Sequence, residues 1–257
     1  MKAEPKIELV ERFFSGTGTT YDRIVKLCTL GFDAWWKKRI LEKIPHGPRR
    51  IIDQACGTGI LTIEIAKRFP GCRVIGVELR DEYLNIARRK VGELKLGNVE
   101  FLLGRAEEIL LEGSFDCITS SYLAKYADID LLVAGAAKML RSGGTFLAHD
   151  FSYPPNTGFA LMWESYFKLL RILGDWKYPE WMTVFAELPE FIRNSDWKRV
   201  LVGCLEEKQF CQISVESLTF GASTVISALK KPSASFLEYS DHVARDAAQK
   251  GSVAVFE

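Results

Sequence analysis

The feature that most constrains the fold is residues 51–59, Ile-Ile-Asp-Gln-Ala-Cys-Gly-Thr-Gly, an apolar strand that runs into a glycine-rich turn. A helical pattern follows the turn, and a second apolar run ends at Glu78. Gly57 and Gly59 allow a sharp fold and a close approach to a ligand, where a Cβ would collide. A carboxylate at the end of the second strand can accept hydrogen bonds from both ribose hydroxyls. The order predicts a βαβ unit that binds a nucleoside.

The residues in and after this turn indicate which nucleoside. A dinucleotide fold needs a third glycine three residues after Gly59, to bring the helix close and admit a pyrophosphate. Thr62 occupies that position. Asp53 would repel a pyrophosphate but suits a ligand that carries an amino group. Both features favour S-adenosylmethionine (SAM), with S-adenosylhomocysteine as product, over NAD.

From residue 50 onward, strand and helix patterns alternate, which is typical of a parallel sheet with right-handed crossovers. We therefore expect an α/β fold, a Rossmann-like seven-stranded, mostly parallel sheet with helices on both faces. The strands are expected at 50–54, 73–77, 99–103, 115–120, 145–149, 210–220 and 223–229. The helices are expected at 6–14, 21–28, 34–44, 60–68, 81–96, 131–140 and 196–208, with Asp33 and Asp81 as caps.

Changes in pattern divide the chain into five segments. They are an N-terminal helical lid (1–48), the SAM-binding core (49–154), a helical insertion (155–195), the end of the core with an antiparallel hairpin (196–231) and a tail (232–257). The lid should hinge at Gly16 and Gly18. The insertion follows strand five and is rich in aromatic residues, so we expect it to cap an apolar substrate. Trp163, Tyr166 and Phe167 share a helix face there, which either lines a pocket or packs.

Composition excludes several classes of function. The net charge of +1 gives no field for nucleic acid. No apolar stretch reaches the ~20 residues that span a bilayer, and no signal-peptide core is visible, so a cytoplasmic protein is expected. Six cysteines without a C-x-x-C pair and three scattered histidines predict no metal site. Cys56 is read as a small residue that fills the turn.

Other motifs carry a resemblance to a known family. The segments 21–24 and 30–37 contain a tyrosine-aspartate, then a threonine-leucine-glycine turn, then tryptophan-lysine. Residues 115–121, 140–144 and 150–154 follow in matching order. Over residues 10–230 the chain resembles the ubiquinone/menaquinone C-methyltransferases, which are class I SAM-dependent methyltransferases. The resemblance implies methylation of an aromatic carbon in a quinone-type precursor.

The chain departs from this family at two places. Where the family has phenylalanine-glycine, an apolar residue and arginine-asparagine, residues 122–126 read Tyr-Leu-Ala-Lys-Tyr. Arg105 stands where an acid or asparagine would bind the adenine amino group, and an arginine cannot accept a hydrogen bond. The adenine contact is therefore expected from backbone groups, from Glu107 or from elsewhere. Methylation of oxygen or nitrogen in another small metabolite, or SAM binding without turnover, stays open.

The motifs assign each candidate cofactor residue to a part of SAM. Asp53, Ala55 and the Gly57-Thr58-Gly59 backbone would face the methionine portion, with Ser121 beside its carboxylate. Tyr21 and Lys37 would reach the same carboxylate from the lid, although Lys37 also suits a solvated helix face. Glu78 would bind the ribose. The expected adenine contacts are Leu79, Ala106 and Glu107.

Candidates for a substrate base follow strand five, where parallel sheets place ligands. His149 or Asp150 could polarise a phenolic hydroxyl of the acceptor. The alternatives are that Asp150 caps the next turn and that His149 points into a helix layer. The expected partner is a small apolar or aromatic acceptor, with no nucleic acid and no integral membrane segment. Transient contact with a membrane surface and a homodimer stay open.

Overall fold

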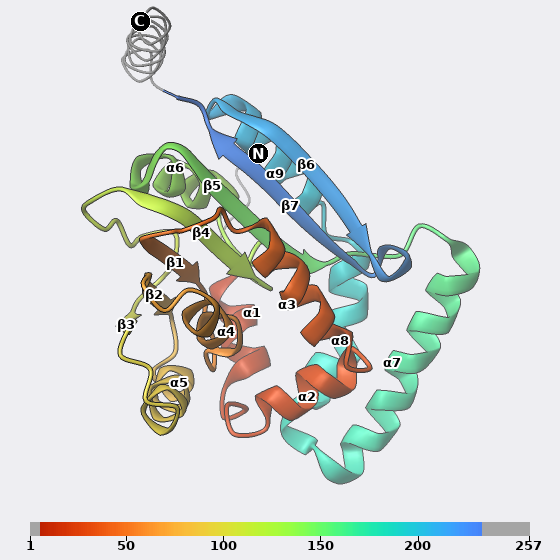
Figure 1. The fold of residues 1–257 in the computed structure, drawn as a ribbon. Coiled ribbons are helices and arrows are strands. Elements are labelled where there is room, and N and C mark those ends of the chain that lie inside the picture. The colour runs from red at the N-terminus through yellow and green to blue at the C-terminus, as the bar shows by residue number, and fades with distance from the viewer. Residues whose placement is uncertain (1–5, 233–257) are drawn as a thin grey trace, which may run out of the picture.

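The computed structural model describes residues 6–232, which form a seven-stranded sheet covered by helices on both faces (Figure 1). The strand order is β3-β2-β1-β4-β5-β7-β6. Strand β7 pairs antiparallel with β5, and β6 pairs antiparallel with β7. The strands are β1 (Arg50–Gln54), β2 (Arg73–Glu78), β3 (Val99–Leu103), β4 (Phe115–Ser121), β5 (Leu140–Phe151), β6 (Phe210–Leu218) and β7 (Ser223–Lys230). The predicted fold class is confirmed.

The predicted helices are present, and several of them begin or end at other residues than predicted. They are α1 (Ile7–Phe14), α2 (Tyr21–Cys28), α3 (Phe32–Lys43), α4 (Ile60–Arg68), α5 (Asp81–Glu93), α6 (Ile129–Met139), α7 (Thr157–Lys177), α8 (Met182–Arg193) and α9 (Trp197–Glu207). Two short 3-10 turns, Pro179–Trp181 and Thr219–Gly221, complete the described elements. The insertion after β5 is therefore α7 and α8. Most of the predicted tail lies outside the described residues.

Two predicted helix caps are wrong. Gly31, at φ 81°, precedes α3, and no side chain caps that end. Asp33 instead lies buried in the first turn, where Lys37 and Tyr122 bind its carboxylate. Asp81 is the first residue of α5 and forms no cap hydrogen bond, and α5 ends at Glu93, before the predicted Leu96. Asp33 thus binds Lys37 and Tyr122 instead of the helix end, and Asp81 faces solvent.

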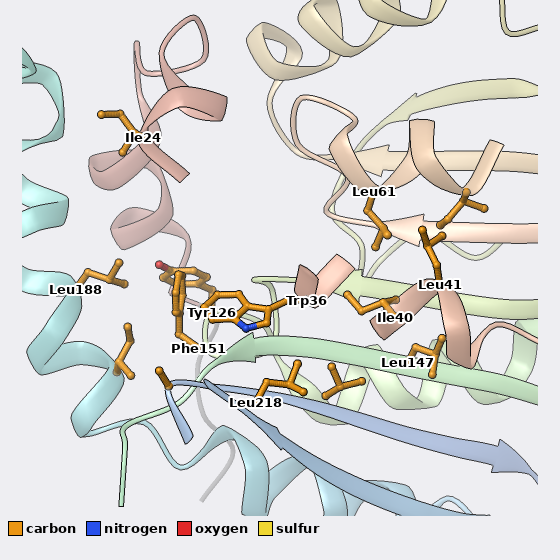
Figure 2. Packing of buried hydrophobic residues seen from close by; sticks show 14 of the residues in the cluster. Ile24, Trp36, Ile40, Leu41, Leu61, Tyr126, Leu147, Phe151, Leu188 and Leu218 are labelled. Carbon is orange, nitrogen blue, oxygen red and sulfur yellow. The ribbon is translucent and has the colours of Figure 1, made fainter. Parts of the chain in front are cut away.

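Alternation along the strands produces two apolar layers, one on each face of the sheet. Ile51 and Leu147 face the layer that includes α3, α4, α7 and α8, part of which is drawn in Figure 2. Their neighbours Ile52 and Phe146 face the layer built with α6 and α9. Because side chains alternate across a strand, each buried run of the sequence supplies both layers.

The helical insertion is packed into the first layer. Trp163 and Phe167 are buried with ring centroids 4.6 Å apart. A Cβ at Gly174 would lie 2.6 Å from the Phe185 ring, so this glycine allows α7 and α8 to approach closely. The aromatic face of α7 is part of the core, and neither of the two cavities described below is lined by it.

Candidate active site

The glycine-rich turn lies at the carboxyl end of β1 and opens helix α4. Ala55, Gly57 and Gly59 all have positive φ, at 52°, 58° and 82°. A Cβ at Gly59 would lie 3.1 Å from the Cβ of Ala87, so this glycine sets the approach of α4 to α5. A Cβ at Gly57 would meet no atom closer than 3.9 Å, which leaves the space above it open. The turn therefore presents backbone to a cavity at Gly57 and packs at Gly59.

Glu78 closes the opposite side of this turn. Its two carboxylate oxygens accept the amide N–H of Gly57, at 2.9 Å, and of Arg80, at 3.0 Å. Burial raises the pKa of Glu78, and these amide donors oppose the rise. Each oxygen has one protein donor and keeps acceptor capacity for a second. The side chain lines the larger of two cavities, so a ribose diol could bind there.

Two adjoining cavities lie at the carboxyl ends of β1, β2 and β4. The larger is lined by eight predicted residues, Tyr21, Ala55, Gly57, Glu78, Leu79, Ala106, Glu107 and Ser121. The smaller adds three more, Lys37, Asp53 and Thr58. Both cavities share Tyr21, Ala55, Gly57, Ser121 and Tyr122. Of the twelve predicted cofactor residues, Gly59 lines neither.

Asp53 is held at the floor of the smaller cavity by two threonines. Thr62 donates to one carboxylate oxygen at 2.6 Å, and Thr119 donates to the other at 2.8 Å. Burial raises the pKa of Asp53 to about 6, against these two hydrogen bonds. Thr62 stands where a dinucleotide fold would have glycine, and here its hydroxyl orients the acid of the turn.

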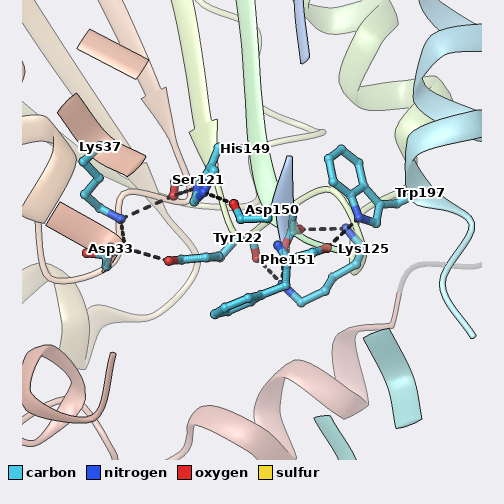
Figure 3. A network of polar contacts seen from close by, with 10 residues as sticks. Asp33, Lys37, Ser121, Tyr122, Lys125, His149, Asp150, Phe151 and Trp197 are labelled. Carbon is cyan, nitrogen blue, oxygen red and sulfur yellow. Dashed lines mark hydrogen bonds and ion pairs between the residues drawn. The ribbon is translucent and has the colours of Figure 1, made fainter. Parts of the chain in front are cut away.

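Lys37 is buried, not solvated, and reaches the junction of the two cavities (Figure 3). Its ammonium donates to Asp33 Oδ1 at 2.6 Å and lies 3.5 Å from Ser121 Oγ. The hydroxyl of Tyr122 donates to the same Asp33 oxygen at 2.6 Å. The lid thus places one positive and one negative group beside the end of β4, where a zwitterionic amino-acid moiety would be complemented.

His149 lies beneath this junction, and neither cavity is lined by it. Its Nδ1 is 2.8 Å from Ser121 Oγ and its Nε2 is 2.7 Å from Ser223 Oγ. Burial, with help from Lys37 and Lys125, lowers the pKa of His149 well below its ordinary value, so the ring is neutral at physiological pH. The imidazole reaches the cavities only through Ser121.

Asp150 forms a fully buried ion pair with Lys125. Its carboxylate also accepts the backbone N–H of Lys125 at 3.1 Å and that of Phe151 at 2.7 Å. Burial raises the pKa of Asp150 and lowers the pKa of Lys125, while the pairing opposes both shifts. Asp150 lines neither cavity, and its contacts fix the loop after β4 against β5.

Sequence reasoning did not assign a site role to the loop after β4 or to the first helix. Tyr122 adopts a left-handed φ of 65° and stacks on Phe151, with ring centroids 4.7 Å apart. The larger cavity is also lined by Leu123, Tyr126 and three residues of α1, Ile7, Val10 and Phe14. The departure at residues 122–126 was the available signal for the loop. The helical period of α1 could not show which way its apolar face turns.

The lid is fastened to the core through helix α5. Glu82 accepts the amide N–H of Gly16 at 3.2 Å and that of Gly18 at 2.7 Å. Thr17 Oγ1 lies 2.6 Å from the hydroxyl of Tyr83. The expected hinge glycines are therefore where the lid meets the helix that follows Glu78.

Other site chemistry is limited within residues 6–232. This part of the chain contains no group of three or more histidine, cysteine or acidic side chains that could hold a metal ion. None of its helices is long and apolar enough to cross a membrane. Arg105, at the edge of the larger cavity, forms ion pairs with Glu107 and Glu108. The polar groups that face the cavities are thus side chains and backbone of the protein itself.

The fold, with a glycine-rich turn and a buried acid at the end of the second strand, is that of a SAM-dependent methyltransferase of the Rossmann-like class. Residues 2–230 match the model of the ubiE/COQ5 methyltransferase family, and the chain belongs to this family. Glu78 and Lys37 offer the acceptor and donor that the ribose and the methionine carboxylate of SAM require. The residues present therefore fit the cofactor.

Relatives and solved structures agree with this assignment. A demethylmenaquinone methyltransferase of Thermus thermophilus is 29% identical over 218 residues, which cover 82% of this chain and 97% of the relative. A ubiquinone/menaquinone biosynthesis C-methyltransferase of Teredinibacter turnerae is 29% identical, covering 86% and 91%. A geranyl diphosphate C-methyltransferase from Streptomyces coelicolor shares the fold at TM-score 0.56 and 14% identity, covering 77% and 79%.

Proposed function

We propose that this methyltransferase transfers the methyl group of SAM to a ring carbon of a reduced, quinone-type aromatic precursor. The observation that carries the proposal is the apolar wall of the larger cavity. Ile7, Val10 and Phe14 of α1 line this cavity together with Glu78 and Gly57. Together with the relatives named for quinone methylation, this wall favours an apolar acceptor over a charged one.

We assign the cofactor to both cavities. The adenosine would occupy the part of the larger cavity lined by Glu78, Leu79 and Ala106, with its ribose on Glu78, and the acceptor would occupy the part lined by Ile7, Val10 and Phe14. The methionine portion would extend into the smaller cavity toward Lys37 and Asp53. Tyr21, Gly57 and Ser121 line both cavities, so the methyl donor is expected beside them.

The chemistry requires the acceptor in its hydroquinone form. A ring carbon activated by a neighbouring hydroxyl forms the new C–CH3 bond as the S–CH3 bond of SAM breaks. S-adenosylhomocysteine leaves, and the ring carbon loses one proton. Because the protein forms no covalent intermediate in this displacement, its contribution is orientation and exclusion of water.

We propose that His149 and Asp150 act through neighbouring residues instead of touching the acceptor. His149 would orient the Ser121 hydroxyl at the junction of the cavities, since its Nδ1 lies 2.8 Å from that hydroxyl. Asp150 would hold the loop of residues 122–126 through Lys125. Substitution of either residue should lower turnover and leave SAM affinity nearly unchanged.

We further propose the five segments as structural units, with residues 1–48 as a lid over the cofactor; residues 155–195, which were expected to cap the substrate, line neither described cavity. A cytoplasmic location and a homodimer are part of the same proposal, and cell fractionation and sedimentation velocity would test them. An acceptor with a long apolar tail resides in lipid, so brief contact with a membrane surface follows from the proposed substrate.

The test is turnover with methyl-labelled SAM and a short-chain demethylmenaquinol. We expect label on a ring carbon, located by NMR of the product. Label on oxygen or nitrogen, or turnover of an amine and not of the hydroquinone, would replace the quinone proposal with another small metabolite. SAM binding by calorimetry without turnover of any hydroquinone or catechol would mean a cofactor-binding protein that lacks this activity.

A further inference from the structure

Helix α7 has two apolar faces, and the structure covers only one of them. Trp163, Phe167 and Leu170 on its inner side are buried in the core. On its outer side Ile172 and Trp176 are 69% and 85% exposed. An ordinary surface helix is apolar on one face and polar on the other. The outer face of α7 is therefore built for a contact that the described residues do not supply.

Two neighbouring turns extend this surface. Phe220, between β6 and β7, contacts Phe159 at the start of α7, with ring centroids 5.1 Å apart. The hydroxyl of Tyr166 in α7 donates to the carbonyl of Leu27, just before the α2–α3 turn that exposes Leu30. Figure 1 shows α7 on the outer flank, with this turn and the β6–β7 turn close to it.

We call this surface the outer apolar face, and its most exposed members are Leu30, Leu161, Met162, Ile172, Trp176 and Phe220. Eight of the fifteen exposed large apolar side chains among the described residues lie on these three segments. Single exposed hydrophobes are normal on a protein surface, whereas a continuous group marks an interaction site.

Basic side chains accompany the apolar ones. Lys168, Arg171 and Lys177 are exposed on α7, beside Ile172 and Trp176. Of the acids nearby, Glu164 pairs with Arg193, and Glu180 accepts a hydrogen bond from Thr20. An apolar face with Lys and Arg at its sides and Trp near its end is typical of a helix that lies in the interface of an anionic bilayer.

We propose that the outer apolar face docks the protein on the surface of an anionic phospholipid bilayer, with α7 lying in the plane of the interface. A role for this contact in delivering acceptor rests on the proposed function; the contact itself does not. α2 and α3, which flank the exposed Leu30, carry Val25 and Lys37 on the inner side at the smaller cavity. The docked face and the cofactor site therefore share two helices.

A bilayer explains the face better than a second copy of the chain does. In a two-fold dimer the same patch meets itself, so two surfaces that both carry the α7 lysines and arginine would face each other. Like charges that face each other oppose association, whereas anionic headgroups attract them. The basic groups thus favour lipid as the occupant.

The experiment is flotation of the full-length protein with vesicles of phosphatidylcholine containing about one third phosphatidylglycerol, compared with phosphatidylcholine alone. We expect the protein to float with the anionic vesicles. The double variant Ile172→Ser/Trp176→Ser should bind about tenfold more weakly. The triple variant Lys168→Gln/Arg171→Gln/Lys177→Gln should lose the preference for anionic lipid.

The matched control is Leu103→Ser/Leu131→Ser, which removes two exposed apolar side chains from β3 and α6, away from the outer apolar face. It should bind like the unmodified protein. If the unmodified protein fails to float, or if both double variants bind alike, the inference is wrong. If sedimentation velocity shows a dimer that Ile172→Ser/Trp176→Ser converts to monomer, a second copy is the occupant and lipid is not.

Two further measurements separate this inference from the proposed function. Calorimetry of the double variant with S-adenosylhomocysteine should give unchanged affinity, which shows that the fold and site are intact. Vesicle binding without turnover of any hydroquinone would leave the docking surface standing and remove the proposed acceptor. Turnover of a short-chain hydroquinone by a protein that never floats would leave the proposed acceptor standing and remove the docking surface.

Discussion

The two edges of the candidate active site differ in what their polar groups contact. At the ends of β1 and β2, Gly57 and Glu78 present backbone and carboxylate to open space. At the end of β5, His149 and Asp150 are sealed beneath the surface, each engaged on both sides by the protein. The first edge is shaped for a ligand, and the second is shaped to hold a loop.

The contrast shows that position at a strand end does not by itself make a residue a contact residue. Parallel sheets do place ligands at this edge, which made all four residues reasonable candidates. The loop after β4 turns Tyr122 into a left-handed conformation and covers Asp150 with Lys125. A chain that must hold such a loop needs polar anchors beneath it, and those anchors lie where a catalytic base was expected.

The largest effect should come from breaking the buried pair at the second edge. Lys125→Met leaves the Asp150 carboxylate buried without its cation and should lower the free energy of unfolding by about 3–5 kcal/mol. Lys125→Met/Asp150→Asn should recover much of this loss. Urea unfolding measures it, with Lys67→Met, from an exposed pair, as control. A loss as small as in the control would mean that the pair does not anchor the loop.

The first edge is tested by removing its carboxylate. Glu78→Ala should weaken SAM binding by about 2–3 kcal/mol, because two ribose hydroxyls lose a charged acceptor. Calorimetry measures this change. Glu100→Ala, on the exposed side of β3, is the control and should bind SAM normally. Unchanged affinity in a folded Glu78→Ala protein would remove the ribose assignment and with it the contrast between the edges.

Asp53 lies between these extremes, since it is buried yet lines a cavity. Its pKa is raised by burial from 3.8 to about 6, so the folded protein keeps this proton where the unfolded chain has lost it. Its contribution to stability is full below pH about 4 and is lost as pH rises through about 6, by about 3 kcal/mol. Asp53→Asn should remove that decline.

Thermal unfolding of the ligand-free protein between pH 4 and 7 measures the Asp53 effect. Asp81→Asn, which changes an exposed acid of α5, is the control and should follow the unmodified protein. If the Asp53→Asn and unmodified curves run parallel over this range, the carboxylate is ionised throughout and behaves like a surface group.

The smallest effect concerns the lid. Glu82→Ala removes the acceptor of the Gly16 and Gly18 amides and should lower the local stability of residues 7–28 by about 1 kcal/mol. Hydrogen exchange should show these amides exchanging about fivefold faster, with added SAM slowing them again. Glu93→Ala, at the other end of α5, is the control. Equal protection with and without SAM would mean that residues 7–28 are a fixed part of the fold and not a lid that the cofactor orders.

Periodicity and the two glycines were sufficient to predict the sheet and the glycine-rich turn after β1. Strands β1 and β2 are buried apolar runs joined by the short helix α4, and Glu78 is the last residue of β2. These features depend on neighbours in sequence. The glycine turn and its acid could therefore be placed before any tertiary contact was known.

The second edge could not be read in the same way. The end of β5 is buried on both faces from Thr145 to Phe151, so alternation does not reveal which way His149 points. The partners of Asp150 and His149 lie 25 and 74 residues away, at Lys125 and Ser223. The inward face of α7 posed the same difficulty, because an aromatic stripe can line a cavity or fill a core, and Trp163 fills the core.

Glu82, which holds the lid, lies close in sequence to Glu78, which lines the larger cavity. Four residues after Glu78 the backbone has entered α5, and there Glu82 accepts the amide N–H groups of Gly16 and Gly18. The length of chain between Glu78 and Glu82 is therefore a fixed quantity. An insertion or deletion of one residue between the two acids would turn Glu82 by about 100° around the helix axis. The number of residues between Glu78 and Glu82 therefore links the proposed ribose site to the attachment of the lid.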